Sequence, residues 1–175
     1  VRLEVFRRTV VSHNLKKMML KHIIAGFLFG ISLSFISWIV GMIINAILAK
    51  TKYYQKLSNF NFIKRETINK NIGIKYFKWI VRNTFFKYFN QKIKVENKKT
   101  DLTEIRHEMT LSEISHLIGF VFVLFFAIYE CFNQSFVFGL TMMIPNILMN
   151  FFPSLLQQEN KRRIDPIIKR LKNCG

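Results

Sequence analysis

The sequence predicts an all-α integral membrane protein, and three long apolar runs carry that prediction. Of its 175 residues, 50% are hydrophobic and 21% are charged, and the two kinds are segregated into separate blocks. A soluble domain would mix them at helical or strand period, whereas runs of about 20 apolar residues match the thickness of a bilayer. We therefore expect about three transmembrane helices in a single membrane domain.

The first apolar run extends from Ile23 to Leu48, and we place the first span at residues 23–49. At 1.5 Å per residue it is about 39 Å long, enough to cross the hydrocarbon with some tilt. The run is about twice the length of a signal-peptide core, and no small-x-small cleavage site follows it, so we expect it to be retained. We expect a single crossing, and the alternative is a hairpin that turns near Ser34 or Gly41.

Small residues recur along one face of this first run. Gly26 and Gly30 form a Gly-x-x-x-Gly motif, which Ser34 and Ser37 extend. Small residues let helix backbones approach closely in a membrane. We expect another helix to pack against this face.

The second and third spans are expected at residues 110–132 and 135–157, joined by the short link Asn133-Gln134-Ser135. So short a link makes the two helices an antiparallel hairpin, which brings the polar residues at its two open ends to one face of the bilayer. Cys131 and Cys174 form no disulfide framework and lie in no metal-ligand spacing. The sequence offers no metal site.

Basic residues dominate every segment outside the spans. The formal net charge is +17, with excess Lys and Arg in residues 1–22, 50–109 and 157–175. The positive-inside tendency places the middle block and the basic tail, residues 158–175, on the cytoplasmic side. The basic N-terminal segment, residues 1–22, lies on the opposite side if the first run crosses once.

Residues 50–109 combine this charge with frequent aromatic side chains. Between Ile74 and Val95, apolar residues recur at helical spacing while Lys78, Arg82 and Lys92 occupy other positions. This is typical of an amphipathic segment in the membrane interface that contacts anionic lipid headgroups. Nucleic-acid binders also combine basic and aromatic residues, but three membrane-length runs disfavour that class, and we expect no nucleic-acid partner.

Polar residues at the open end of the predicted hairpin form the candidate site. Ionisable groups near a membrane boundary are costly, so their convergence is a functional-site hypothesis. Two separated motifs contain them: Glu108, Glu113 and His116 before and within the second span, and Asn150, Pro153, Gln157, Asn160 and Arg163 around the end of the third.

These two motifs, together with Lys52-Tyr53-Tyr54 and the stretch from Gly73 to Lys87, give the chain a resemblance to a known family. From about residue 52 to residue 163 it resembles the small membrane acyltransferases typified by glycosyl-4,4'-diaponeurosporenoate acyltransferase, which esterify a carotenoid glycoside. The chain departs from the family pattern between the two glutamates and again after Gln157, where an Arg and a Tyr are replaced. The resemblance therefore implies a lipid-like or glycolipid acceptor in general. It also implies a multi-pass protein of a bacterial cell membrane.

The resemblance also implies roles for the site residues. Acyl transfer to a hydroxyl needs a base and donors that stabilise an oxyanion. His116 would be the base, oriented by Glu113. Glu108, nearer the aqueous side, would hold the other reaction partner or a cationic side chain. Amides would come from Asn150, Gln157 and Asn160, and Arg163 would bind a phosphate of an acyl carrier such as coenzyme A, with no bound cofactor and no metal.

Two alternatives stay open. Thr110 and Glu113 have the spacing of a capping box, so the Glu-x-x-His element could be a helix cap in which His116 only contacts lipid headgroups. The chain could also be a non-enzymatic membrane subunit that uses the Gly26 and Gly30 face to bind a larger partner. A protein with three membrane spans is small. Whether it is an enzyme or a subunit, this favours a homo-oligomer or a larger membrane partner.

Overall fold

The computed structural model confirms the all-α membrane fold. It describes residues 2–58, 76–77, 79, 83 and 101–173, and within these residues the chain is helical with no strand. Three helical stretches are long and apolar enough to cross a membrane: Val11–Leu48, Leu102–Asn133 and Phe136–Asn173. The interfacial helix expected between Ile74 and Val95 falls largely outside the described residues.

The first long helix, α1, extends without interruption over Arg2–Leu48. It has no turn at Ser34 or Gly41, so the hairpin alternative for this segment is wrong. The serine hydroxyls are satisfied within the helix, because Ser34 Oγ donates to Gly30 O at 2.7 Å and Ser37 Oγ donates to Ser34 O at 2.7 Å. A short helix, α2 (Tyr54–Ser58), follows.

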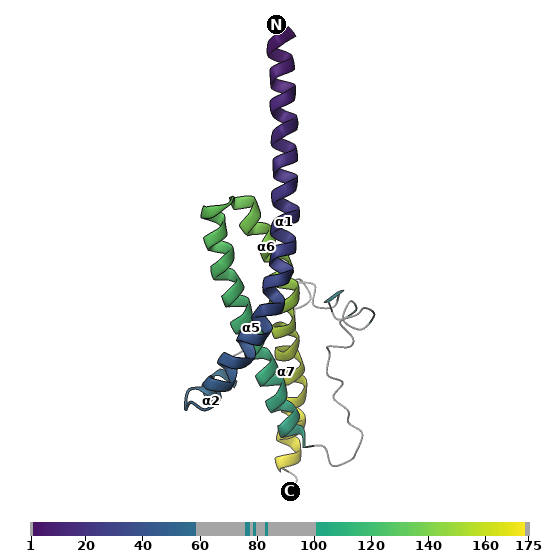
Figure 1. The fold of residues 1–175 in the computed structure, drawn as a ribbon. Helices are drawn as coiled ribbons and strands as arrows, with labels where there is room; N and C mark the ends of the chain where they lie inside the picture. The colour runs from purple at the N-terminus through teal and green to yellow at the C-terminus, as the bar shows by residue number, and fades with distance from the viewer. Residues whose placement is uncertain (1, 59–75, 78, 80–82, 84–100, 174–175) are drawn as a thin grey trace.

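The antiparallel hairpin predicted for the last two spans is confirmed (Figure 1). Its first arm is α5 (Leu102–Asn133), and its second arm consists of α6 (Phe136–Asn146), the π-helical turn η2 (Ile147–Phe151) and α7 (Phe152–Asn173). Ser135 caps α6 by accepting a hydrogen bond from the Phe138 backbone N–H at 3.1 Å. Both arms continue past the spans expected at 110–132 and 135–157, so the membrane helices run on into the adjoining polar segments.

The Gly-x-x-x-Gly face of α1 packs against α6 of the same chain. A Cβ atom on Gly30 would lie 2.7 Å from Met142 O and 2.7 Å from Pro145 Cγ, and one on Gly26 would collide with Thr141 Oγ1. The expected close approach of another helix is therefore confirmed. The chain itself covers this face, so it is not open to a larger partner.

Apolar side chains face outward and polar ones face inward in this bundle. Exposed apolar residues cover the outer faces of the helices, for example Ile39 and Ile43 on α1 and Phe125 on α5, at 57%, 58% and 69% exposure. Lipid tails provide an apolar solvent for such faces, so helix association depends on close packing and interhelical hydrogen bonds. A compact apolar cluster of Leu33, Val123, Ala127 and Met142 fills one part of the interior. Elsewhere buried polar side chains alternate with apolar ones such as Ile114 and Leu155.

Candidate functional site

A row of buried polar side chains follows one face of the second hairpin arm. Asn146, Asn150, Ser154 and Gln158 recur every four residues, and none is more than 2% exposed. Asn150 Nδ2 donates to Asn146 Oδ1 at 2.9 Å and to Ser37 Oγ of α1 at 3.0 Å. The row therefore faces the interior between the helices, where it connects the second hairpin arm to α1.

The π-helical turn η2 keeps this row on one face. Pro145 precedes the turn and lacks the N–H that a regular helix would use, and wide turns of this kind recur at functional sites. The Trp38 indole of α1 donates to Met149 O in the turn at 3.3 Å. The wide turn thus has a specific partner on the neighbouring helix.

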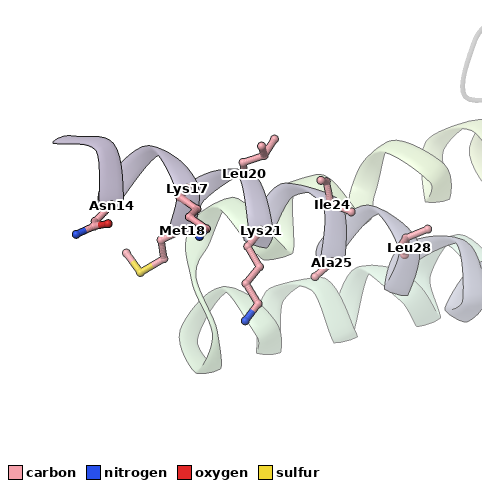
Figure 2. A pocket seen from close by; sticks show the side chains of 8 residues that line it. All are labelled: Asn14, Lys17, Met18, Leu20, Lys21, Ile24, Ala25 and Leu28. Atoms are coloured by element: carbon pink, nitrogen blue, oxygen red, sulfur yellow. The ribbon is translucent and has the colours of Figure 1, made fainter. Parts of the chain in front are cut away.

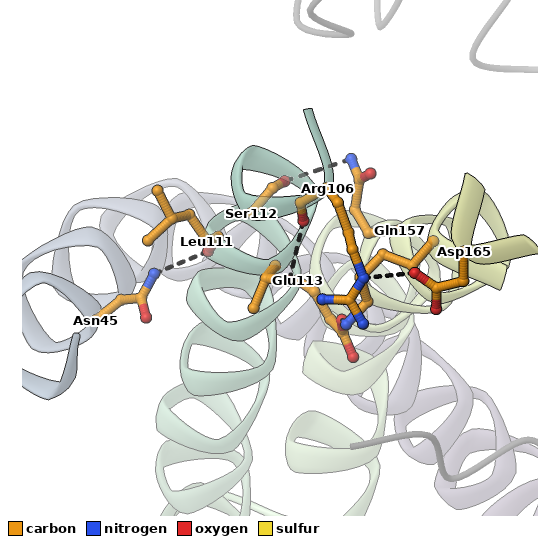
Figure 3. Close-up of polar contacts among 9 residues, drawn as sticks. Asn45, Arg106, Leu111, Ser112, Glu113, Gln157 and Asp165 are labelled. Atoms are coloured by element: carbon orange, nitrogen blue, oxygen red, sulfur yellow. Dashed lines mark hydrogen bonds and ion pairs between the residues drawn. The ribbon is translucent and has the colours of Figure 1, made fainter. Parts of the chain in front are cut away.

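A buried ion pair closes the row at its polar end. Lys161 Nζ of α7 contacts Glu113 Oε2 of α5, and the two side chains are 6% and 2% exposed. Around it, Gln157 Nε2 donates to Ser112 Oγ at 3.4 Å, and Arg106 is paired with Asp165 at 2.5 Å. Figure 3 shows these contacts linking α5 to α7.

His116 lies one turn further into the bundle than Glu113. Its ring meets the Trp38 indole edge to face, with centroids 6.1 Å apart, and its Nδ1 atom is buried without a hydrogen bond among the described residues. Ser112 contacts Gln157 on one side of His116, and the Phe120 ring contacts the Phe151 ring on the other side. These two contacts fix how α5 is aligned with the antiparallel second hairpin arm. That register places His116 at the level of Ser154, whose buried Oγ also has no hydrogen-bond partner in the described part of the chain.

α1 and α2 complete the polar end of the site. Asn45 Nδ2 of α1 donates to Leu111 O at 2.8 Å and to Ser115 Oγ at 2.9 Å. Tyr54 of α2 is only 6% exposed. Burial raises the pKa of the Tyr54 phenol; Asn45 acts in the opposite direction, and the nearby Glu113 charge adds to the rise.

The site lies near one boundary of the hydrocarbon. The polar turn at Ser135 must lie outside the hydrocarbon at the far end, since exposed polar backbone is not tolerated in lipid. A hydrocarbon layer of about 30 Å corresponds to roughly 20 helical residues, which brings the opposite boundary close to Glu113 and His116. These buried polar groups therefore lie close to the membrane interface.

The structure brings together some of the predicted site residues and leaves others apart. Glu113 and Asn150 are buried between the helices, and half-buried His116 has its Nδ1 atom buried there. Gln157 and Asn160 are half-buried, Gln157 facing Ser112. Glu108 is exposed, and Arg163 is exposed and paired with Glu159 at 2.8 Å.

The capping alternative for Thr110 is wrong. α5 begins at Leu102, and its N-cap is Asp101, whose side chain accepts a hydrogen bond from the Thr103 backbone N–H at 2.8 Å. Thr110 lies two turns inside the helix, where it is buried and donates to Arg106 O at 3.0 Å. Glu113 therefore has no capping role and instead pairs with Lys161 across the helix interface.

Sequence reasoning missed several residues of the site: Asn45, Tyr54, Asn146, Ser154, Gln158 and Lys161. The spacing of four from Asn146 to Gln158 was a visible signal in an apolar segment. Lys161 offered no such signal, because it follows the polar stretch Gln157-Gln158-Glu159-Asn160 and resembles the start of a solvated tail.

The fold and site together define a class: small three-helix membrane proteins with a cluster of buried polar residues near one membrane boundary. In the described residues, no three His, Cys, Asp or Glu side chains cluster as metal ligands would. The sequence profile of the glycosyl-4,4'-diaponeurosporenoate acyltransferase family matches residues 50–170, and the chain belongs to this family. No curated protein and no solved structure matches the chain.

Proposed function

We propose that the chain is a membrane acyltransferase that moves an acyl group onto a hydroxyl of a lipid-like or glycolipid acceptor at the cytoplasmic membrane face. One observation carries the proposal. In a member of an acyltransferase family, buried polar atoms of His116, Ser154 and Gln158 from two helices converge near a bilayer boundary without partners in the described residues. Burying such atoms costs about 1–3 kcal/mol each, which favours a role in binding a polar group.

His116 is the candidate base. It takes the proton of the acceptor hydroxyl while the hydroxyl oxygen bonds to the carbonyl carbon of an acyl thioester. The carbon–sulfur bond then breaks, and the proton passes from the imidazole to the leaving thiolate. Trp38 restricts the imidazole ring from one side, which fits a base that must hold one orientation.

Stabilisation of the oxyanion is assigned to the second hairpin arm. The Gln158 amide and the Lys161 ammonium lie on the α7 face that meets α5, and amide or cationic donors are suited to a developing negative charge. Glu113 balances the Lys161 charge. The exposed guanidinium of Arg163 remains the candidate contact for a phosphate of a carrier such as coenzyme A.

The experiment measures acyl transfer by the purified full chain in nanodiscs, from acyl-coenzyme A to a glycosylated polyene carboxylate, with the ester product detected by mass spectrometry. His116→Ala should reduce the rate by about a hundredfold or more. The matched control is His107→Ala, because His107 lies on the same helix but is exposed to the surroundings.

Two results would contradict the proposal. One is a parent chain that acylates nothing across a panel of glycolipid and polyene acceptors while remaining folded. The other is an equal rate loss in the His116 and His107 variants, since only His116 faces the bundle interior.

A further inference from the structure

The first helix extends well past the end of the hairpin. His22 Nδ1 lies 2.6 Å from Ser135 Oγ, so the α5 to α6 turn ends at the level of His22. Figure 1 shows α1 continuing alone beyond that turn. At 1.5 Å per residue, its remaining 20 or so residues reach about 30 Å further.

A hollow of about 640 Å³ lies along one side of α1 at this level. Figure 2 shows Asn14, Lys17 and Lys21 in the part of the hollow nearer the N-terminus of α1, with Met18 among them, and Ile24 and Leu28 further along the helix. The three apolar side chains are more than half exposed, at 53%, 53% and 57%. The hollow thus combines two cations one helical turn apart with an apolar strip that leads into the membrane.

We propose that this hollow, defined by Asn14, Lys17, Met18, Lys21, Ile24 and Leu28, binds one anionic phospholipid. The polar turn at Ser135 marks the membrane boundary on this side, and Lys17 and Lys21 lie within two turns beyond it. They are placed to contact a headgroup phosphate, with Asn14 as an additional donor or acceptor. The acyl chains would follow the apolar strip past Ile24 and Leu28 into the bilayer.

Charge favours a lipid over a second copy of the chain. The sequence has no Asp or Glu between residues 5 and 65. A parallel pair of α1 helices joined through this face would therefore bring Lys17 and Lys21 of both copies together without a counter-charge. An anionic headgroup supplies that counter-charge, and each basic residue near an anionic surface strengthens binding severalfold.

The test uses the purified full chain in phosphatidylcholine nanodiscs that contain a trace of photoactivatable lipid. Photoactivatable phosphatidylglycerol should label the segment around residues 14–28 about tenfold more than photoactivatable phosphatidylcholine does. Lys17→Gln with Lys21→Gln should reduce that labelling to the phosphatidylcholine level. The matched control, Lys169→Gln with Lys172→Gln, removes the same charge from the exposed end of α7 and should leave it unchanged.

All four lysines are exposed, so both double variants should remain folded. Their melting temperatures, compared with that of the parent, check this. Equal labelling by the two lipids would show an ordinary lipid-facing surface and would overturn the proposal. So would complete suppression by soluble glycerol phosphate, which would show that the acyl chains contribute nothing. Crosslinking of two copies through residues 14–28 in place of lipid labelling would overturn it in favour of self-association.

Discussion

Lys161 of α7 and Glu113 of α5 form an ion pair that is almost fully enclosed by the helices of the bundle. Charges removed from water near a bilayer are costly unless they are paired. Each side chain therefore supplies a counter-charge that offsets part of the cost of burying the other. The pair joins the two arms of the hairpin at the end where the arms are open.

The first prediction concerns the stability contributed by this pair. Glu113→Gln removes the buried carboxylate that Lys161 contacts and should lower the free energy of unfolding by about 3–5 kcal/mol, as should Lys161→Met. The double variant should recover most of the loss because neither charge remains. Unfolding is followed by circular dichroism in detergent.

The control for that prediction is Asp165→Asn. Asp165 pairs with Arg106, but their side chains are 46% and 24% exposed, so its loss should cost less than about 1 kcal/mol. If the double variant of Glu113 and Lys161 were as unstable as the less stable of its two single variants, the pair would contribute through packing rather than charge.

The second prediction concerns topology. α1 is a single helix and the hairpin crosses twice, so positions 13 and 134 should lie on one side of the membrane and positions 56 and 172 on the other. Single-cysteine variants, made after Cys131 and Cys174 are replaced by Ser, are labelled with an impermeant maleimide in intact cells. Labelling of positions 13 and 172 from the same side would contradict a single crossing by α1.

The third prediction concerns the close contact between α1 and α6. Gly30→Leu places a side chain where Met142 O and Pro145 Cγ already lie, and overpacking of this kind typically costs about 1–3 kcal/mol. Ala25→Leu is the control, because Ala25 lies on the same helix but is exposed. If both variants melted at the same temperature, the packing of α1 on α6 would not be as tight as the structure indicates.

The fourth prediction concerns pH. Burial raises the pKa of Tyr54 above its ordinary value of 10.0, so the folded state holds the phenol proton more tightly than the unfolded state. The corresponding stability is complete below about pH 10 and is lost as the pH rises through the folded-state pKa. The melting temperature of Tyr54→Phe should therefore fall less steeply above pH 10 than that of the parent.

Tyr53→Phe is the natural comparison, because Tyr53 is adjacent and 71% exposed. The melting temperature of Tyr53→Phe should depend on pH in the same way as that of the parent. Parallel curves for the parent and both variants would mean that the Tyr54 phenol is not buried in the folded protein.

The sequence was sufficient to predict the helices because their number and pairing depend on length and hydropathy. Three runs long enough to cross and a three-residue polar link leave few arrangements, and these were predicted correctly. The helix ends were less predictable. α5 begins at Leu102, in a polar stretch where hydropathy gives no signal.

Which side chains face the interior was harder to predict. A regular helix continued from Asn146 favours Gln157 and Asn160 as the inward residues, whereas the structure buries Gln158 and Lys161. The wide turn at Ile147–Phe151 contains one more residue than a regular turn and shifts every later position by one. Glu113 and His116 lie on the unbroken helix α5, where no such shift occurs, and buried atoms of both face the interior.

The wide turn holds one extra residue. Which later side chains face the interior therefore depends on the number of residues that precede them as well as on their identity. Deleting one exposed residue there, such as Leu148, would let the turn close as a regular helix and leave every later side chain in its present orientation, because the wide turn holds one residue more than a regular one. Gln158 and Lys161 would still face α5, and Lys161 would keep its contact with Glu113. The same deletion in the regular helix that follows would instead rotate every later residue by about 100° and exchange one set of inward-facing polar groups for another.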